Sequence, residues 1–213
     1  MIRAVISDFG GVLTTPLTGS FQGIADKSGV TLAALGQALE ALRARSGAHP
    51  LHELECGRMS ESVFVAGLRE ALSEQLGREV ELDGFADTLW EGLFPNEPMI
   101  AFMASLRAEG LRMALLTNNV REWELRWRAL APIDEIFELV VDSAFVGVRK
   151  PDPEIYELAV TGLGVPAQEC LFIDDIEVNC VAARAAGMAS VVFRDTDQAI
   201  VEIRAALAGG LVV

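Results

Sequence analysis

Five short apolar runs spaced along the chain restrict the fold more than any other pattern. The runs cover residues 3–7, 111–116, 139–141, 171–173 and 189–193. Helical patterns separate the last four runs, at residues 121–130, 153–161 and 177–186, and a Pro or Gly follows each pattern closely. Strands that alternate with helices of this length are typical of α/β proteins, so we expect a doubly wound, parallel, Rossmann-like sheet.

A long helical stretch, residues 18–93, interrupts this alternation after the first run. It shows helical periodicity and no convincing strand. Its apolar side chains recur in two stripes at the spacing of amphipathic helices: Leu32, Leu35, Leu39 and Leu42, then Val63, Leu68, Leu72 and Leu76. The sequence therefore predicts a helical cap domain at 18–93, inserted into an α/β core domain at 1–17 and 94–213.

The charge and cysteine content exclude several classes of protein. The chain has 31 acidic and 17 basic residues, a net charge of −14, and its basic residues form no cluster. We therefore expect no nucleic-acid partner, which would need a basic patch, and no binding to anionic membranes. No apolar run reaches the ~18 residues of a membrane-spanning helix. Three cysteines without close spacing, and a start without a secretion signal, predict a cytoplasmic protein.

Two tryptophans four residues apart, Trp123 and Trp127, lie in the first of the three helical patterns. A tryptophan pair at this spacing is typical of internal packing or of a subunit contact. The sequence does not decide between the two, so a homodimer stays open.

Polar side chains follow the predicted strands at the point where each strand ends. Asp8 follows the first run, Thr117 and Asn118 follow the second, and Asp174 and Asp175 follow the fourth. The carboxyl ends of parallel strands share one edge of a sheet, where ligands bind. Lys150, one of only two lysines in the chain, follows the third run. The sequence therefore predicts a polar site at this edge.

Four segments resemble, in order, the four motifs of the haloacid dehalogenase superfamily. They read D-F-G-G-V-L-T, L-L-T-N-N, V-R-K-P-D-P-E-I-Y and F-I-D-D-I-E-V-N. The helical insertion after the first motif is similar to the α-helical cap of one subclass of this superfamily. The residues of these segments most resemble those of phosphatase-like members, including the N-terminal domain of soluble epoxide hydrolases.

The resemblance implies a phosphatase, a hydrolase of small phosphorylated metabolites. It implies that Asp8 is the nucleophile and forms an aspartyl-phosphate. Thr117 and Asn118 would hydrogen-bond the phosphoryl oxygens, and Lys150 would neutralise their charge.

The resemblance also implies a magnesium site. Asp8, the carbonyl oxygen of Gly10 and Asp175 would hold one Mg²⁺, while Asp174 and Asn179 would lie behind these ligands and orient them. The residues themselves favour a cation here, because adjacent carboxylates repel unless a positive charge offsets them.

Position 10 departs from the family pattern. Phosphatases of this family usually have a second Asp there, which protonates the leaving oxygen and then activates water. Gly10 keeps the backbone carbonyl but lacks the acid, and losing such a group typically costs ~10²–10⁴-fold in rate. Thr14, Thr15 or a residue of the cap could relay the proton instead.

Two other interpretations stay open because of Gly10. The chain could be a non-catalytic member that binds a ligand or a partner in the same pocket. It could also be a metal-free 2-haloacid dehalogenase, in which an Asp nucleophile displaces halide from carbon. Dehalogenases have neutral residues where this chain has Asp174 and Asp175, which favours the phosphatase.

Overall fold

The computed structural model describes residues 1–209 of the chain, apart from the side chains of residues 17 and 18. Within this part of the chain, five parallel strands form one sheet in the order β3-β2-β1-β4-β5. The strands are β1 (Ala4–Ser7), β2 (Arg112–Thr117), β3 (Leu139–Asp142), β4 (Cys170–Asp174) and β5 (Ala189–Val192). Each lies within about one residue of a predicted run. The central strand β1 pairs with β2 on one side and β4 on the other.

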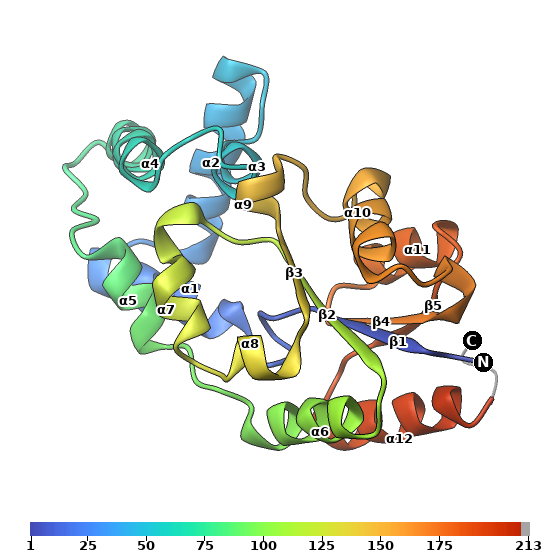
Figure 1. The fold of residues 1–213 in the computed structure, drawn as a ribbon. Helices are drawn as coiled ribbons and strands as arrows, with labels where there is room; N and C mark the ends of the chain where they lie inside the picture. The colour runs from blue at the N-terminus through green and yellow to red at the C-terminus, as the bar shows by residue number, and fades with distance from the viewer. Residues whose placement is uncertain (210–213) are drawn as a thin grey trace.

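Helices cover both faces of this sheet (Figure 1). They are α6 (Glu97–Ala108) and α12 (Thr196–Leu207) on one face, and α10 (Pro153–Leu163) and α11 (Glu177–Ala185) on the other. Successive residues of β1 point to opposite faces: Val5 packs in the same cluster as Met103 and Ile203, and Ile6 packs with Tyr156. The prediction of a doubly wound parallel sheet is confirmed.

Short helical elements connect the strands. They are η1 (Arg121–Trp123), α7 (Glu124–Arg128), α8 (Ile133–Ile136), α9 (Ser143–Val146) and η2 (Ala167–Glu169). Trp127 of α7 is fully buried, with its ring centroid 5.4 Å from that of Phe9. This tryptophan therefore serves internal packing, one of the two roles that the sequence left open.

Five helices lie between β1 and α6, and this segment contains no strand. They are α1 (Leu17–Ser28), α2 (Leu32–Ser46), α3 (Pro50–Glu55), α4 (Glu61–Leu76) and α5 (Phe85–Glu91). Thr31 and Ser60 begin α2 and α4 by accepting hydrogen bonds from backbone N–H groups of the first turn. These inserted helices share an apolar core of their own, in which Leu35, Leu68 and Leu72 are buried. The predicted helical insertion after the first strand is therefore present.

The predicted stripes are only partly buried. Leu32, Val63 and Leu76 are 45%, 58% and 39% exposed. The buried face of α4 comprises Phe64, Leu68, Ala71 and Leu72, and that of α2 comprises Ala34, Leu35 and Ala38. Both helices have more apolar residues than one face can bury. Each predicted stripe therefore includes side chains that the packing leaves exposed.

Within residues 1–209, no helix is both long enough and apolar enough to cross a membrane.

Candidate active site

Three carboxylates meet where β1 and β4 end. Oxygen atoms of Asp8, Asp174 and Asp175 all lie within 4.8 Å of one another. The strands are neighbours in the sheet, and the backbone N–H of Asp8 donates to the carbonyl of Ile173 over 2.8 Å. The sheet register therefore brings together the carboxylates that the sequence placed at strand ends.

Lys150 supplies the positive charge of this cluster. Its side chain is 1% exposed, and its Nζ lies 2.7 Å from Asp8 Oδ1 and 2.7 Å from Asp174 Oδ2. A charge buried this deeply needs close partners of opposite sign. The structure thus places Lys150 beside Asp8, as the sequence predicted, and the two carboxylates share one ammonium group.

Both carboxylate oxygens of Asp174 accept hydrogen bonds. Its Oδ1 accepts from the backbone N–H of Ile176 over 2.8 Å, and Asn179 Nδ2 donates to both of its oxygens, over 3.0 and 3.1 Å. The hydroxyl of Tyr156 donates to the Asn179 carbonyl over 2.9 Å and ties α10 to this network. With Lys150 also bound, Asp174 has little capacity left for a metal ion, which suits the orienting role predicted for it.

Asp175 is only half-buried and lies against Gly11. Gly11 has a φ of +80°, and a Cβ at this position would collide with the Asp175 carboxylate. Glycine is therefore required at position 11 for two reasons: the backbone is left-handed, and the Asp175 side chain approaches closely. Gly10, its neighbour in the same turn, does not have a positive φ.

The three carboxylates of the cluster share a single ammonium group, that of Lys150. Burial raises the pKa of Asp8 to about 7; Lys150 opposes this shift, and Asp174 and Asp175 add to it. Burial, followed by repulsion from Asp174, also raises the pKa of Asp175. Burial lowers the pKa of Lys150, but attraction to Asp8 and Asp174 outweighs it, so the net shift is upward. Oxygen ligands of this kind, beside a glycine that makes room for Asp175, fit Mg²⁺.

Thr117 and Asn118 lie at the end of β2, next to the cluster's central strand. Thr117 is 1% exposed. The Asn118 side chain forms a reciprocal pair with the main chain of Lys150: its Nδ2 donates to the carbonyl over 3.0 Å, and its Oδ1 accepts from the N–H over 2.8 Å. Sequence reasoning did not foresee this pair, which fixes the segment that carries Lys150.

A small cavity of about 60 Å³ lies between the strand ends and the inserted helices. The lining includes three residues that the sequence analysis singled out, Gly10, Thr117 and Asn118. The others are Phe9, Leu51, Glu55, Leu89, Trp90, Leu93, Asn119, Val120 and Trp123. The cavity thus joins the predicted site to residues from α3 and α5.

Glu55 is a cavity residue to which the sequence analysis assigned no role. Its Oε2 accepts from Arg149 Nε over 2.6 Å, and its side chain is only 15% exposed. Burial raises its pKa, although Arg149 opposes this shift. The one available signal was Gly57, two residues on, where a Cβ would collide with the Ala144 carbonyl. That close approach docks the end of α3 onto the core.

The threonines considered as proton relays are placed differently. The Thr14 hydroxyl accepts from the Gly11 N–H over 3.2 Å and donates to the Thr15 carbonyl over 3.0 Å. Thr15 Oγ1 accepts from the Phe94 N–H over 3.1 Å. These contacts hold the chain where it leaves and re-enters the core. The lining of the cavity includes neither threonine.

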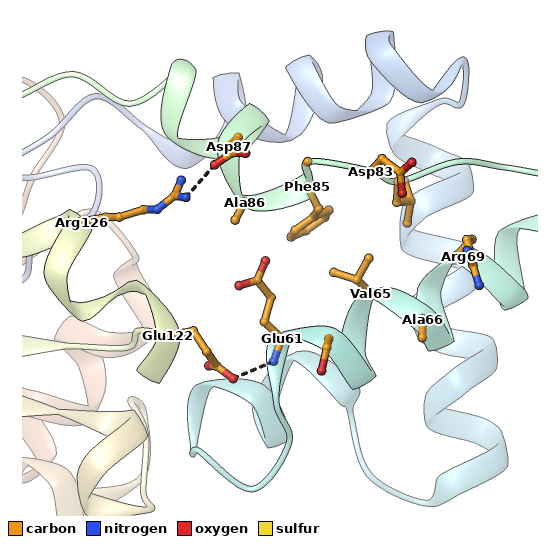
Figure 2. A pocket seen from close by; sticks show the side chains of 13 residues that line it. Glu61, Val65, Ala66, Arg69, Asp83, Phe85, Ala86, Asp87, Glu122 and Arg126 are labelled. Carbon is orange, nitrogen blue, oxygen red and sulfur yellow. Dashed lines mark hydrogen bonds and ion pairs between the residues drawn. The ribbon is translucent and has the colours of Figure 1, made fainter.

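A larger open groove, of about 640 Å³, lies farther out between α4, α5 and α7 (Figure 2). Two polar contacts cross it: Glu122 accepts from the Glu61 N–H over 3.1 Å, and Arg126 pairs with Asp87 over 2.6 Å. The groove contains none of the predicted site residues. Its contacts link the inserted helices to the segment after β2.

Comparisons with known proteins agree with the motifs. A family model described as haloacid dehalogenase-like hydrolase matches residues 2–187. The chain is 32% identical over 112 residues to the bifunctional epoxide hydrolase 2 of Sus scrofa, covering 51% of this chain and 20% of that protein. It is 35% identical over 162 residues to a phosphoserine phosphatase of Thermus thermophilus, covering 72% of this chain and 63% of that protein. The matches thus span a fifth of the first relative and less than two thirds of the second.

Solved structures share the fold. A haloacid dehalogenase family enzyme of Bacteroides thetaiotaomicron, solved with magnesium and inorganic phosphate, has a TM-score of 0.66 and 20% identity, covering 93% of this chain and 99% of that one. An L-2-haloacid dehalogenase of Xanthobacter autotrophicus, solved with chloropropionic acid covalently bound, has a TM-score of 0.64 and 22% identity, covering 100% and 85%. At these identities the likeness concerns the fold alone.

Proposed function

Since this chain belongs to the haloacid dehalogenase-like hydrolase family, we propose that it is a Mg²⁺-dependent phosphatase of small phosphorylated metabolites. The observation that carries the proposal is the buried ammonium of Lys150, which lies 2.7 Å from both Asp8 and Asp174. A phosphoryl group brings two negative charges to its nucleophile, so a site that attacks it with a carboxylate needs fixed positive charge at that point.

Asp8 is the nucleophile in this proposal. Lys150 binds Oδ1, so we assign the attack to Oδ2, which forms a bond to phosphorus as the bond to the leaving alcohol breaks. The departing oxygen takes a proton from a water molecule, which leaves a hydroxide. The hydroxide then attacks the phosphorus of the aspartyl-phosphate, and the bond between phosphorus and the Asp8 oxygen breaks, which releases hydrogen phosphate and restores the Asp8 carboxylate.

The neighbours of Asp8 hold the phosphoryl group. The Thr117 hydroxyl would donate to one phosphoryl oxygen. The Asn118 side chain is engaged with the main chain of Lys150, so its backbone N–H is the donor that we assign to the phosphoryl group. This refines the role that the sequence suggested for Asn118.

Asp8, the Gly10 carbonyl and Asp175 are the residues that would hold Mg²⁺. When bound, the ion offsets the negative charge that accumulates on the phosphoryl oxygens. Asp174 and Asn179 orient the site through the hydrogen bonds described above. We also propose that the inserted helices act as a cap domain at 18–93, which covers a core at 1–17 and 94–213.

A screen of phosphate monoesters with and without Mg²⁺ tests this function. The parent protein should release inorganic phosphate, and a chelator should stop the release. Asp8→Asn should fold and lose at least ~10³-fold in turnover, because it lacks the nucleophile. The exposed Asp83→Asn is the matched control and should keep full activity. Turnover by Asp8→Asn within tenfold of the parent would rule out the covalent mechanism.

The same screen separates the other two interpretations. A 2-haloacid dehalogenase would release halide from 2-chloropropionate whether or not a chelator is present. A non-catalytic member would turn over neither substrate class. In both cases the phosphatase proposal would be wrong.

A further inference from the structure

The hydroxyl of Ser143 bridges two parts of the molecule that are far apart in the sequence. It accepts from the backbone N–H of Asn119 over 3.0 Å and donates to the main-chain carbonyl of Glu55 over 2.6 Å. Ser143 begins α9 and is fully buried. A hydroxyl has one proton to donate and lone pairs left to accept, so both bonds form at once. One oxygen atom therefore joins the turn after β2 to the last residue of α3.

The turn after β2 carries the groups that we assign to the phosphoryl oxygens. Thr117 and the N–H of Asn118 are the proposed donors, and the Asn118 side chain holds the main chain of Lys150. Asn119 comes next, and its Oδ1 accepts from the following backbone N–H over 2.9 Å. Ser143 fixes Asn119 from outside the turn. Donors to a transferring phosphoryl group act through exact placement, so a bond that fixes this turn bears on the reaction.

Two further contacts tie the end of α3 to the core. Glu55 pairs with Arg149 over 2.6 Å, and Arg58 donates to the Gly147 carbonyl over 2.8 Å. Both contacts hold α3 on the segment that leads to Lys150, whereas Ser143 holds it on the turn after β2. They remain when the Ser143 hydroxyl is removed. A substitution of Ser143 can therefore separate the docking of α3 from the effect of that docking on the turn.

Loss of the hydroxyl would leave two main-chain groups without their partner. Asn119 is only 9% exposed, and a buried N–H without an acceptor is costly. The turn and the end of α3 would shift independently toward other partners. The donors on the turn would then lose the fixed position that the structure gives them.

We propose that Ser143 is a positioning residue that couples the docking of α3 to the geometry of the phosphoryl-binding turn. The inference rests on the proposed phosphatase function and names a means by which the inserted helices regulate that site. Coupling of this kind is reciprocal. If the docking of α3 orders the turn, a ligand that orders the turn must also strengthen the docking of α3.

Ser143→Ala tests the kinetic consequence. With a phosphate monoester that the parent hydrolyses, kcat should fall by about 10-fold and KM should change by less than ~3-fold, because the donors are displaced but still present. Ser143→Cys keeps a weak donor and acceptor, so its kcat should lie between the two, and it provides the same comparison if Ser143→Ala does not fold.

Ser20→Ala is the matched control. Ser20 lies in α1 and is equally buried, but its hydroxyl has no hydrogen-bond partner within residues 1–209. This variant should keep the parental kcat. An unchanged kcat in the Ser143 variants would overturn the proposal.

Hydrogen exchange gives a readout that does not depend on turnover. The probe is inorganic phosphate with Mg²⁺, added to saturation by each protein's own titration. In the parent and in Ser20→Ala, phosphate should slow exchange at the end of α3 by ~3-fold or more. The N–H of Cys56, which donates to the His52 carbonyl over 2.9 Å, is one such amide. In Ser143→Ala these amides should exchange at the same rate with and without phosphate.

The outcomes separate this inference from the proposed function. Equal slowing in the parent and Ser143→Ala, or no slowing in the parent, would overturn the coupling. Either result together with Asp8-dependent hydrolysis would contradict this inference alone. Absence of hydrolysis by the parent would overturn the proposed function, while the exchange experiment would still decide the coupling.

Discussion

The carboxylate cluster and the cavity beside it hold their polar groups in opposite ways. In the cluster, Lys150 and Asp174 are buried, pair with each other, and Asp174 also accepts from Asn179 of α11. In the cavity, one carboxylate stands in a wall of leucine and tryptophan side chains that comes from the inserted helices. The cluster therefore depends on the register of adjacent strands, whereas the cavity depends on how a separate group of helices docks. Because the two regions rest on different contacts, a substitution in one need not disturb the other.

The different roles that we propose for Asp175 and Asp174 give the largest expected effect. Asp175→Ala should weaken Mg²⁺ binding by about 100-fold, because it removes a ligand. Asp174→Asn should weaken it by only about 10-fold, because it removes no proposed ligand and keeps the acceptor for the Ile176 N–H, although it loses the oxygen that accepts from Lys150. Calorimetric titration with Mg²⁺ measures both. The reverse order would mean that the two adjacent carboxylates have been assigned the wrong way round.

Gly10 relates to both regions, since it lines the cavity and its carbonyl is one of the Mg²⁺ ligands that we propose. Gly10→Asp should speed hydrolysis of an alkyl phosphate by ~10–100-fold and of 4-nitrophenyl phosphate far less, because an aryl leaving group needs little protonation. Gly10 has no left-handed backbone to oppose the change. Rates for the two esters, with a melting curve of the variant, decide the matter. A folded variant with an unchanged ratio would show that the missing acid does not limit turnover.

Gly11 tests whether the cluster needs the close approach of Asp175. Gly11→Ala should weaken Mg²⁺ binding by about 10-fold, because the new methyl group displaces the carboxylate. Gly147→Ala is the control: Gly147 has the same φ of +80°, but open space surrounds its Cβ position. It should cost about 1 kcal/mol of stability and leave Mg²⁺ binding unchanged. If both variants bind Mg²⁺ equally, backbone strain and not contact explains any loss.

Asp142, at the carboxyl end of β3, is a buried carboxylate that forms no ion pair within residues 1–209. Burial raises its pKa to about 6, from an ordinary value near 4. The folded state therefore binds more protons between these values, and the free energy of unfolding falls as the pH rises from about 4 to 6. Asp142→Asn should remove this slope and raise the free energy of unfolding at pH 7 by about 1–2 kcal/mol.

Denaturant titrations at pH 4.5 and 7 measure the effect of Asp142→Asn, and Asp195→Asn is the control. Both residues begin a helix by accepting from its first turn, but Asp195 is exposed. Its substitution should change stability little at either pH. A loss of stability in Asp142→Asn at pH 7 would show that its charge is favourable where it is.

The sequence predicted the cluster because strand ends are local features. An apolar run that ends at Asp8 or Asp174 fixes the position of that residue at the sheet edge, and parallel pairing brings the two together. The same reasoning placed Lys150 beside them. The sequence did not reveal that Asn118 binds the main chain of Lys150, because its side chain turns toward another segment.

The cavity could not be predicted in the same way. Glu55 ends a helix of six residues, and its approach to the core depends on the angle at which α3 docks. Helical periodicity predicts which face of a helix is buried. In α4 even this prediction was one residue off, because Val63 is exposed and Phe64 is buried. It does not give the position of one helix relative to a distant sheet.

The scarcity of lysine has a practical use in labelling. All three cysteines are buried, and burial raises their thiol pKa values, so maleimide dyes will find no ready site. Lys150 is equally shielded from acylating reagents. Lys27, by contrast, is 57% exposed and pairs with Glu91 over 2.6 Å, which joins α1 to α5. An amine-reactive fluorophore will therefore attach at Lys27 in preference to Lys150, and the dye at Lys27 will report on the inserted helices.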